Sequence, residues 1–255
     1  VGGNADFDAS GGNITLTDAG NDFVGAVSLR GAAVSISDRS ALSLAALEVG
    51  ALNARSVGAL GLGNGSIAGA LVASSGGGAI TQAGALSVGG ASSIDAGTGA
   101  ITLSNAGNDF GGAVHLSGGA AVVRDANALQ LGTLDVAGLT ATSGGALSLG
   151  SGQVGGNLVA TSQGGGITQA GALSVAGTSS IDAGAGNITL TNAGNDFVGA
   201  VDLAGGAAVV RDANALQLGA LDATSLHATA TTIGLATDVT TSGDQTYNGV
   251  LVLDA

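Results

Sequence analysis

The stretch Thr191–Leu226, TNAGNDFVGAVDLAGGAAVVRDANALQLGALDATSL, decides the fold, because nearly the same residues occur at Ser104–Leu139 as SNAGNDFGGAVHLSGGAAVVRDANALQLGTLDVAGL. A more diverged copy, TDAGNDFVGAVSLRGAAVSISDRSALSLAALEVGAL, covers Thr17–Leu52. The three copies follow one another at a spacing of 87 residues without a gap. Self-similarity at a fixed period is typical of repeat proteins, in which each unit buries its apolar face against the next unit.

Inside this period, apolar residues alternate with small polar residues, as in the I-T-L segments that begin at Ile14, Ile101 and Ile188. Alternation with a period of two predicts β-strands. Gly-Gly, Gly-Asn and Ser-Gly pairs separate the strands and favour sharp turns. The pattern therefore predicts an all-β, right-handed parallel β-helix (β-solenoid) with about 20 residues per coil and about four coils in each 87-residue super-repeat.

The domain organisation follows from the repeat. We expect residues 1–255 to form a single β-helical segment, with cassettes at about 14–100, 101–187 and 188–255, the last of them incomplete. The sequence begins in the middle of the pattern, with VGGNADF, which predicts an interior fragment of a longer protein.

Composition narrows the classes of function. Gly accounts for 49 residues, Pro, Cys, Met and Trp are absent, and 2% of the residues are aromatic. Small and β-branched side chains fill a narrow core, and without cysteine there is neither a disulfide framework nor a thiolate metal site. The net charge of -13 disfavours nucleic acid as a partner. Polar residues interrupt every apolar run, so we expect no insertion into a membrane.

Several segments resemble the repeats of filamentous-haemagglutinin-like exoproteins: ITQAGALSV, SSIDAG-G-ITL, NAGNDF-GAV-L and, at Ser242–Leu253, SGDQTYNGVLVL. The resemblance covers nearly the whole chain. It implies a repeat region of a large adhesin or contact-dependent-inhibition type of protein, exported by two-partner secretion through an outer-membrane partner. It also implies a secreted or bacterial cell-surface location, and binding of host-cell, matrix or bacterial receptors through other regions. The expected function is a non-catalytic structural shaft that extends a distal binding or effector domain.

One alternative function is a calcium-stabilised repeat module, because carboxylate and amide oxygens gather around the Asn-Asp-Phe triplets. These side chains recur only every 87 residues, too rarely to share an ion between adjacent coils. We therefore expect an Asx or αL turn there, followed by a phenylalanine that packs over the coil. The residues concerned are Asp18, Asn21, Asp22 and Phe23; Asn105, Asn108, Asp109 and Phe110; and Asn192, Asn195, Asp196 and Phe197.

A second alternative is a β-helical polysaccharide lyase or hydrolase, which needs paired carboxylates and a sugar-binding surface. Arg-Asp pairs occur at Arg124–Asp125 and Arg211–Asp212, whereas the first copy has Ser37, Asp38 and Arg39. We expect surface ion pairs at these positions. Tyr247 is the single tyrosine, so little is available for stacking on a sugar. We therefore predict no enzyme activity.

The remaining candidates have structural interpretations. His115 and His227 are expected to be solvent-facing strand residues, and the glycine-rich strings Ser75–Gly78 and Gly164–Gly166 to be corners of the coil. Threonines do not hold the constant register that an ice-binding face needs; they are Thr140, Thr142, Thr161, Thr229, Thr231 and Thr232. We assign no catalytic, cofactor-binding or metal-binding residue and expect no cofactor.

Overall fold

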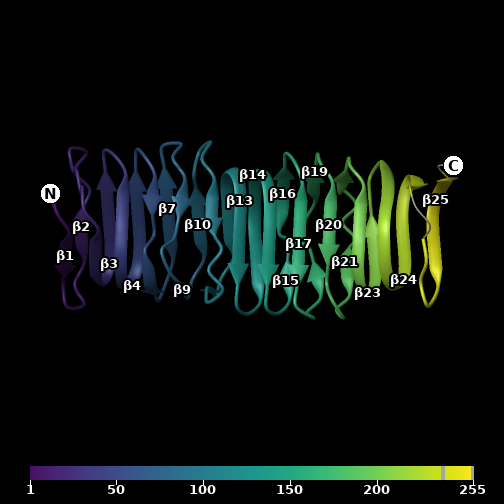
Figure 1. The fold of residues 1–255 in the computed structure, drawn as a ribbon, viewed down its shortest axis with the longest axis horizontal. Coiled ribbons are helices and arrows are strands. Elements are labelled where there is room, and N and C mark those ends of the chain that lie inside the picture. Colours follow the sequence, from purple (N-terminus) through teal and green to yellow (C-terminus); the bar gives the residue numbers. More distant parts are fainter. Residues whose placement is uncertain (237–238, 254–255) are drawn as a thin grey trace. The chain divides into compact units, whose positions relative to one another are not determined.

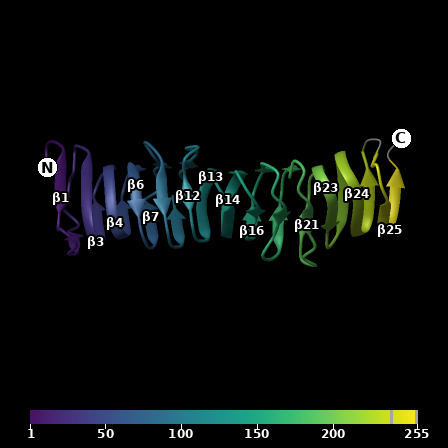
Figure 2. The same cartoon turned by 90° about the horizontal axis from the view of Figure 1, so that it is seen from below.

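The computed structural model describes residues 1–236 and 239–253, and all regular elements in these ranges are β-strands. The chain divides into two units, Val1–Ala126 and Asn127–Ala255. Within each unit the strands pair in parallel with strands of neighbouring coils (Figures 1 and 2). The predicted parallel β-solenoid is confirmed, with about 13 turns of roughly 19 residues. The right-handed sense of the coil stays a prediction.

Most strands are short, because glycine-rich corners interrupt them. The longest strands continue through a corner onto the next side of the coil. The strands of unit 1 are β1 (Ala5–Asp8), β2 (Ile14–Leu16), β3 (Val27–Asp38), β4 (Leu42–Ser56), β5 (Leu60–Gly61), β6 (Asn64–Ile67), β7 (Leu71–Ser75), β8 (Ile80–Thr81), β9 (Leu86–Val88), β10 (Ser92–Asp95), β11 (Ile101–Leu103), β12 (Asp109–Phe110) and β13 (Val114–Asp125).

The strands of unit 2 are β14 (Leu129–Ser143), β15 (Leu147–Ser148), β16 (Ser151–Val154), β17 (Leu158–Ser162), β18 (Ile167–Thr168), β19 (Leu173–Val175), β20 (Ser179–Asp182), β21 (Ile188–Leu190), β22 (Asp196–Phe197), β23 (Val201–Arg211), β24 (Ala215–Leu235) and β25 (Gln245–Leu253). Of these, strands β14–β22 have the same lengths as β4–β12 of unit 1.

Each coil of unit 1 has three sides, and residues on one side pair only with the same side of the next coil. The first side stacks Phe7, Leu29, Leu47, Gly65 and Leu86. The second side stacks Ile14, Val34, Leu52, Leu71, Ser92 and Val114. The third side stacks Leu42, Leu60, Ile80, Ile101 and Ala121.

This pairing defines the number of coils in a cassette. Four coil steps along the second side lead from Ile14 to Ser92, and Ile101, the repeat equivalent of Ile14, lies on the third side. One cassette is therefore about four and one-third coils long, in agreement with the prediction of about four coils, and the extra third moves the repeat on by one side. As a result, equivalent residues that both belong to unit 1, such as Ile14 and Ile101, lie on different sides of the coil.

The core is a narrow column of leucine, isoleucine and valine with one phenylalanine per cassette. Strand positions alternate between buried and accessible: in β10 and β20 the first and third residues are buried, and the second and fourth are exposed. Polar groups are also buried in this column, and in the described part of the chain the hydroxyls of the fully buried Ser92 and Ser179 have no hydrogen-bond partner. Ala5, which lies 87 residues before Ser92, is at the equivalent position and is half-buried.

Replacing the unpartnered hydroxyls tests this description of the core. The variants Ser92→Ala and Ser179→Ala should each raise the free energy of unfolding by about 1 kcal/mol, because a buried hydroxyl without a partner costs roughly 1–3 kcal/mol. Denaturant titration measures the change. The conversion Ala5→Ser is the reciprocal control and should not stabilise the protein. A loss of stability in both alanine variants would show that these hydroxyls have partners.

A second prediction concerns the corners. Gly150 has a φ of +66°, and a Cβ there would lie 2.0 Å from the carbonyl oxygen of Gly132 in the neighbouring coil. Gly164 also has positive φ, +91°, but a Cβ there would meet nothing within 4 Å. Gly164→Ala should therefore cost about 1–2 kcal/mol from backbone conformation alone. Gly150→Ala should cost clearly more, and equal midpoints of unfolding for the two variants would contradict the close approach.

Candidate functional site

The Asn-Asp-Phe triplet of each cassette begins with an Asx turn. The side-chain oxygens of Asp18, Asn105 and Asn192 accept a hydrogen bond from the amide N–H two residues later, at 2.8, 2.9 and 2.9 Å. Among the described non-glycine residues, only Ser10 has positive φ. The predicted turn is thus confirmed in its Asx form, and Gly20, Gly107 and Gly194, which donate these hydrogen bonds, do not have positive φ, so the αL form is not present.

The phenylalanine of each triplet points into the core and is held there by a buried carboxylate. Phe23, Phe110 and Phe197 are at most 5% exposed. Their amide N–H groups donate to a carboxylate oxygen (Oδ2) of the aspartate 15 residues later, at 2.6, 2.6 and 2.7 Å. These aspartates are Asp38, Asp125 and Asp212. We call each set of turn, phenylalanine and aspartate an Asp corner.

In the second and third cassettes a glutamine completes the Asp corner. Asn108 is fully buried and forms a two-way amide pair with Gln82: Gln82 Nε2 donates to Asn108 Oδ1 at 2.7 Å, and Asn108 Nδ2 donates to Gln82 Oε1 at 2.8 Å. Asn108 Oδ1 also accepts from Leu86 N at 3.0 Å, and Nδ2 also donates to the carbonyls of Leu103 and Arg124. Gln169 and Asn195 repeat the pair at the same two distances.

The glutamines were missed by sequence reasoning. The available signal was the I-T-Q motif, in which Gln82 and Gln169 precede their asparagine partners by 26 residues. The amide pairs satisfy backbone groups of three coil segments inside a narrow core. The amide pairs form a structural network, because every polar atom named here has a hydrogen-bond partner within the chain.

The expectation of a surface ion pair at Arg211 and Asp212 is wrong. Asp212 is 3% exposed and points inward, whereas the adjacent Arg211 is exposed, because successive strand residues face opposite sides. Asp212 accepts from the amides of Phe197 and Asn214. Asp38 and Asp125 are buried as well. Burial raises the pKa of the Asp212 carboxyl group, and the two backbone hydrogen bonds oppose this shift.

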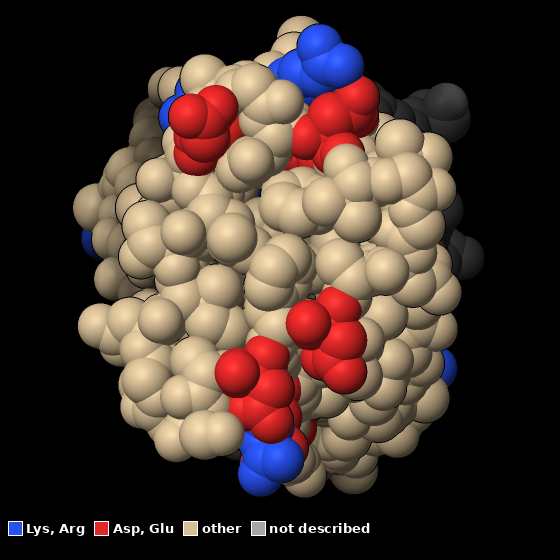
Figure 3. All heavy atoms as spheres, turned by 90° about the vertical axis from the view of Figure 1, so that its left-hand side faces the viewer, with Lys and Arg blue, Asp and Glu red and all other residues tan. Residues whose placement is uncertain are grey.

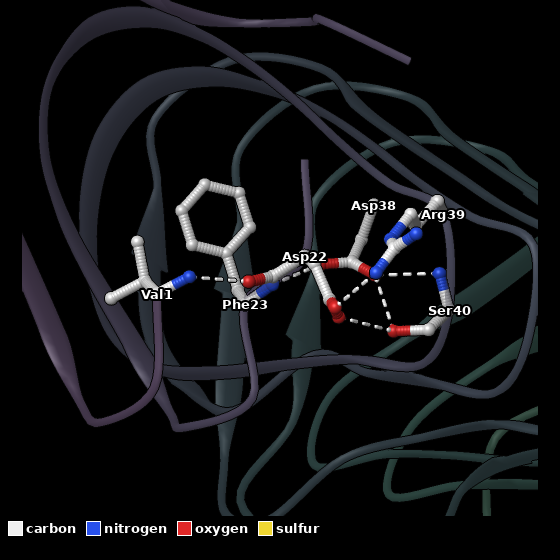
Figure 4. Close-up of polar contacts among 6 residues, drawn as sticks. All are labelled: Val1, Asp22, Phe23, Asp38, Arg39 and Ser40. Atoms are coloured by element: carbon white, nitrogen blue, oxygen red, sulfur yellow. Dashed lines mark hydrogen bonds and ion pairs between the residues drawn. The ribbon is translucent and has the colours of Figure 1, made fainter. Parts of the chain in front are cut away.

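In the first cassette Arg39 forms an ion pair with Asp22, whereas the sequence suggested Asp38 as its partner. Arg39 Nη2 donates to Asp22 Oδ2 at 2.6 Å, and Ser40 Oγ donates to Asp22 Oδ1 at 3.1 Å and to Asp38 Oδ1 at 2.8 Å (Figure 4). The hydrogen bond from Arg39 lowers the pKa of Asp22, and the same contact raises the pKa of Arg39. The pair is exposed, so it contributes little to stability.

Unit 1 also has a surface groove, and a β-bulge lies on two of the strands that form it. The pairing of β3 with β4 shifts register between Val27 and Leu29. A hollow of about 440 Å³ crosses β1, β3, β4 and β6 here, lined by Asp6, Asp8, Arg30 and Glu48 among other residues. Arg30 Nη1 lies 3.9 Å from Asp8 Oδ2, and Arg30 Nε lies 3.4 Å from Glu48 Oε2. Figure 3 shows acidic and arginine side chains next to each other on the face that carries the first coils.

Unit 2 contains the equivalent groove, two cassette lengths further along the chain. The register of β23 and β24 shifts between Val201 and Leu203, and a hollow of about 240 Å³ there is lined by Asp182, Asp202 and Asp222. Ala204 replaces Arg30. Two of the three carboxylates already form hydrogen bonds with the backbone, Asp182 with Gly184 N and Asp202 with Ala220 N. The grooves thus recur with the bulge, and their charge differs between cassettes.

The other candidates occupy structural positions. His115 and His227 lie at accessible positions of β13 and β24, as predicted, and His227 Nε2 is 3.1 Å from Asn248 Nδ2. Ser75–Gly78 and Gly164–Gly166 form corners, with positive φ at Gly77 and Gly164. Thr142 pairs with Thr161, but Thr140 pairs with Val159, which agrees with the absence of a threonine register. Tyr247 donates to Gln245 Oε1 at 2.7 Å.

Metal ligands do not gather in the described ranges: no three His, Asp or Glu side chains there are placed to hold an ion. Within residues 1–236 and 239–253 the structure has no helix long and apolar enough to cross a membrane.

Asp212 provides a test of the Asp corner. Asp212→Asn should lower the free energy of unfolding by about 1–3 kcal/mol at pH 7, because an amide group replaces one oxygen that accepts an N–H. The raised pKa of Asp212 means that the folded state binds its proton more readily than the unfolded state. The wild-type protein therefore gains stability from this group as pH falls from 7 toward about 4.

The difference in unfolding free energy between wild type and Asp212→Asn should accordingly widen over this range, measured by denaturant titration at several pH values. The control Asp222→Asn removes the same charge from an exposed position and should change the free energy of unfolding much less at pH 7. A difference in unfolding free energy between wild type and Asp212→Asn that becomes smaller toward pH 4 would contradict the burial of an ionised Asp212.

Comparison with known proteins adds a family. No curated protein and no solved structure matches the chain. The family model of the DUF5649 repeats, described as repeats of unknown function, matches residues 1–30, 49–117 and 137–204. These segments make up more than half of the chain and lie in both units. The chain therefore belongs to the DUF5649 family of repeats of unknown function.

Proposed function

We propose that this chain is a non-catalytic structural shaft of a secreted or surface-displayed bacterial adhesin, and that it extends a distal binding or effector domain. The observation that carries the proposal is the stacking of coils in which polar side chains satisfy the backbone of the chain itself. The carboxylates of the buried Asp corners and the amide pair of Gln82 and Asn108 form hydrogen bonds of this kind within the chain. Each coil added to such a protein increases its length by about 4.8 Å, the spacing of neighbouring strands, and also adds surface.

The absence of an assigned catalytic residue is part of the proposal. In the groove of unit 1, Asp8 accepts a hydrogen bond from Ser10 N, and Glu48 faces the guanidinium of Arg30. In the groove of unit 2, two carboxylates cap backbone amides. A glycosidase needs one carboxyl group as an acid and another as a base or nucleophile. The contacts in both grooves favour structural roles instead.

The export route is the finer part of the proposal and rests on the resemblance to filamentous-haemagglutinin-like exoproteins. It comprises two-partner secretion through an outer-membrane partner, and receptor binding through other regions. Two properties of the chain support it. There is no cysteine that could be oxidised during passage through the periplasm, and each coil forms its contacts mainly with its neighbours. The net charge of -13 supports a partner other than nucleic acid.

Deleting one cassette tests the shaft. Removal of residues 101–187 joins Ala100 to Ile188, so that Ile188 replaces Ile101 beside Ile80 and Val201 replaces Val114 beside Ser92. The shortened chain should fold with nearly the same melting temperature. Its maximum dimension in small-angle X-ray scattering should fall by about 20 Å, the rise of four and one-third coils.

The matched control deletes residues 101–180, which is close to four coils of average length but leaves Gly194 in the place of Val114. This variant should melt at a clearly lower temperature than the cassette deletion. An unchanged maximum dimension after the cassette deletion would overturn the shaft. Release of reducing or unsaturated sugar ends from polysaccharides, abolished by a single Asp substitution, would overturn the non-catalytic assignment.

A further inference from the structure

The grooves of the two units have the same construction but differ at their centre. In unit 1 the strand register places Asp8, Arg30 and Glu48 in one row across three coils, with Arg30 in the middle. Each position of this row has a counterpart two repeat lengths of 87 residues further along the chain. The counterparts pair in the same register in unit 2 and are Asp182, Ala204 and Asp222. Unit 2 thus keeps the two flanking carboxylates and lacks the guanidinium group between them.

Unit 1 shows what such a row of side chains can hold. Arg30 uses two different nitrogens, Nη1 toward Asp8 Oδ2 at 3.9 Å and Nε toward Glu48 Oε2 at 3.4 Å. Asp8 uses its other oxygen, Oδ1, to accept a hydrogen bond from Ser10 N at 2.6 Å. One flanking carboxylate can therefore cap a backbone amide and contact a guanidinium group at the same time.

The carboxylates of unit 2 are arranged in the same way, and several of their oxygens are unused. Asp182 Oδ1 accepts a hydrogen bond from Gly184 N at 2.8 Å. Asp202 Oδ1 accepts one from Ala220 N at 2.7 Å. The Oδ2 atoms of these two residues and both oxygens of Asp222 have no hydrogen-bond or ion-pair partner among the described residues. Three carboxylates therefore line a hollow of about 240 Å³ without a cation from the described part of the chain.

The lining of this groove favours a guanidinium group over a metal ion. Within residues 1–236 and 239–253 no three carboxylate or imidazole side chains are placed to hold an ion together. The flanking positions lie two coil steps apart, about 10 Å, a separation that suits a broad, planar cation with five N–H donors. Ile181 and Leu203 add apolar surface to the lining, on which the methylene groups of an arginine can pack.

We propose that the groove of unit 2 binds the guanidinium group of an arginine side chain from a partner polypeptide, between Asp182 and Asp222. In unit 1 the occupant of the equivalent position, Arg30, is itself such a side chain. Asp202 adds a third carboxylate where unit 1 has Ser28, and a cleft lined by charges of one sign attracts the opposite charge from solution. The proposal concerns a groove on the side of the coil and does not depend on the shaft function.

A peptide titration followed by NMR tests the binding. The probe is the tripeptide acetyl-Gly-Arg-Gly-amide, added in about 0.15 M salt, which screens charges that are more than about 8 Å apart. The amide signals of Ala204 and Asp222 should shift and saturate in the millimolar range, because exposed ion pairs are individually weak. The same peptide with citrulline, a neutral analogue of arginine, should leave these signals unchanged. Equal shifts with both peptides, or shifts that do not saturate, would overturn the proposal.

Two reciprocal substitutions connect the binding to the missing arginine. Ala204→Arg should recreate the ion pairs of unit 1 inside unit 2, and the peptide should then bind this groove at least tenfold more weakly. Arg30→Ala should open the groove of unit 1, and the amide signals of Asp8 and Glu48 should then respond to the peptide. Neither position is buried, so circular dichroism should show an unchanged fold. Wild-type binding behaviour in both variants would contradict the proposal.

A charge-neutral pair of variants tests the groove without adding a bulky side chain. Asp222→Asn removes a flanking carboxylate from an exposed position and should weaken peptide binding severalfold. Asp135→Asn removes the equivalent carboxylate of the second cassette, which is also exposed, and should leave the titration of Ala204 unchanged. Equal weakening by the two variants would indicate attraction to the net charge of the chain and would overturn the site.

Two further ligands distinguish the source of the cation. Free L-arginine brings its own carboxylate into an acidic groove and should bind more weakly than the tripeptide. Tighter binding of the free amino acid would exclude a polypeptide partner. Acetyl-Gly-Lys-Gly-amide should also bind more weakly, because an ammonium group is a point charge. Equal or tighter binding of the lysine peptide, or saturation of the same signals by calcium at a lower concentration, would overturn the guanidinium assignment.

Discussion

Parallel backbone pairing between successive coils is the constraint on which the rest of the structure depends. A residue on one side of a coil can satisfy its backbone only against the same side of the next coil, as the row from Leu42 through Leu60 and Ile80 to Ile101 shows. Coil length can vary only at corners and bulges, where pairing is interrupted. Glycine is required where a corner brings two coils into backbone contact, and Gly150 against Gly132 is such a point.

The same constraint explains why polar groups are buried in so thin a core. At each Asp corner the chain leaves regular pairing to form an Asx turn, and the phenylalanine that follows has an amide that needs an acceptor. Asp38, Asp125 and Asp212 supply it. Asn108 and Gln82 extend the network across neighbouring coils. A satisfied buried network fixes geometry more strictly than apolar contacts alone, so these corners set the register of the coils on either side.

Some of this architecture could be predicted from the sequence, and the limits have a physical basis. The 87-residue period and the two-residue alternation predicted strands, turns and a solenoid, because both are visible in the sequence without knowledge of which residues pair. The extra third of a coil was not predictable, because it depends on which residues pair, as with Ile101 beside Ile80 rather than beside Ser92. The amide pair of Gln82 and Asn108 joins residues 26 positions apart, and no local pattern links them. Arg211 and Asp212 were assigned to the surface together because adjacency in sequence conceals that they face opposite sides of a strand.

Comparison of the cassettes separates what the fold needs from what it leaves free. Inward positions keep their residue, as at Leu29, Leu116 and Leu203, whereas the outward position that follows changes from Arg30 to Ser117 and Ala204. In unit 1 the extra third of a coil also moves equivalent surface positions from one side to the next: Arg30 lies on the first side and Ser117 on the second. Within unit 1 the repeat therefore keeps the core contacts while it places equivalent surface residues on a different side of the coil. Such a chain can change its outer chemistry without disturbing the stacking that holds it together.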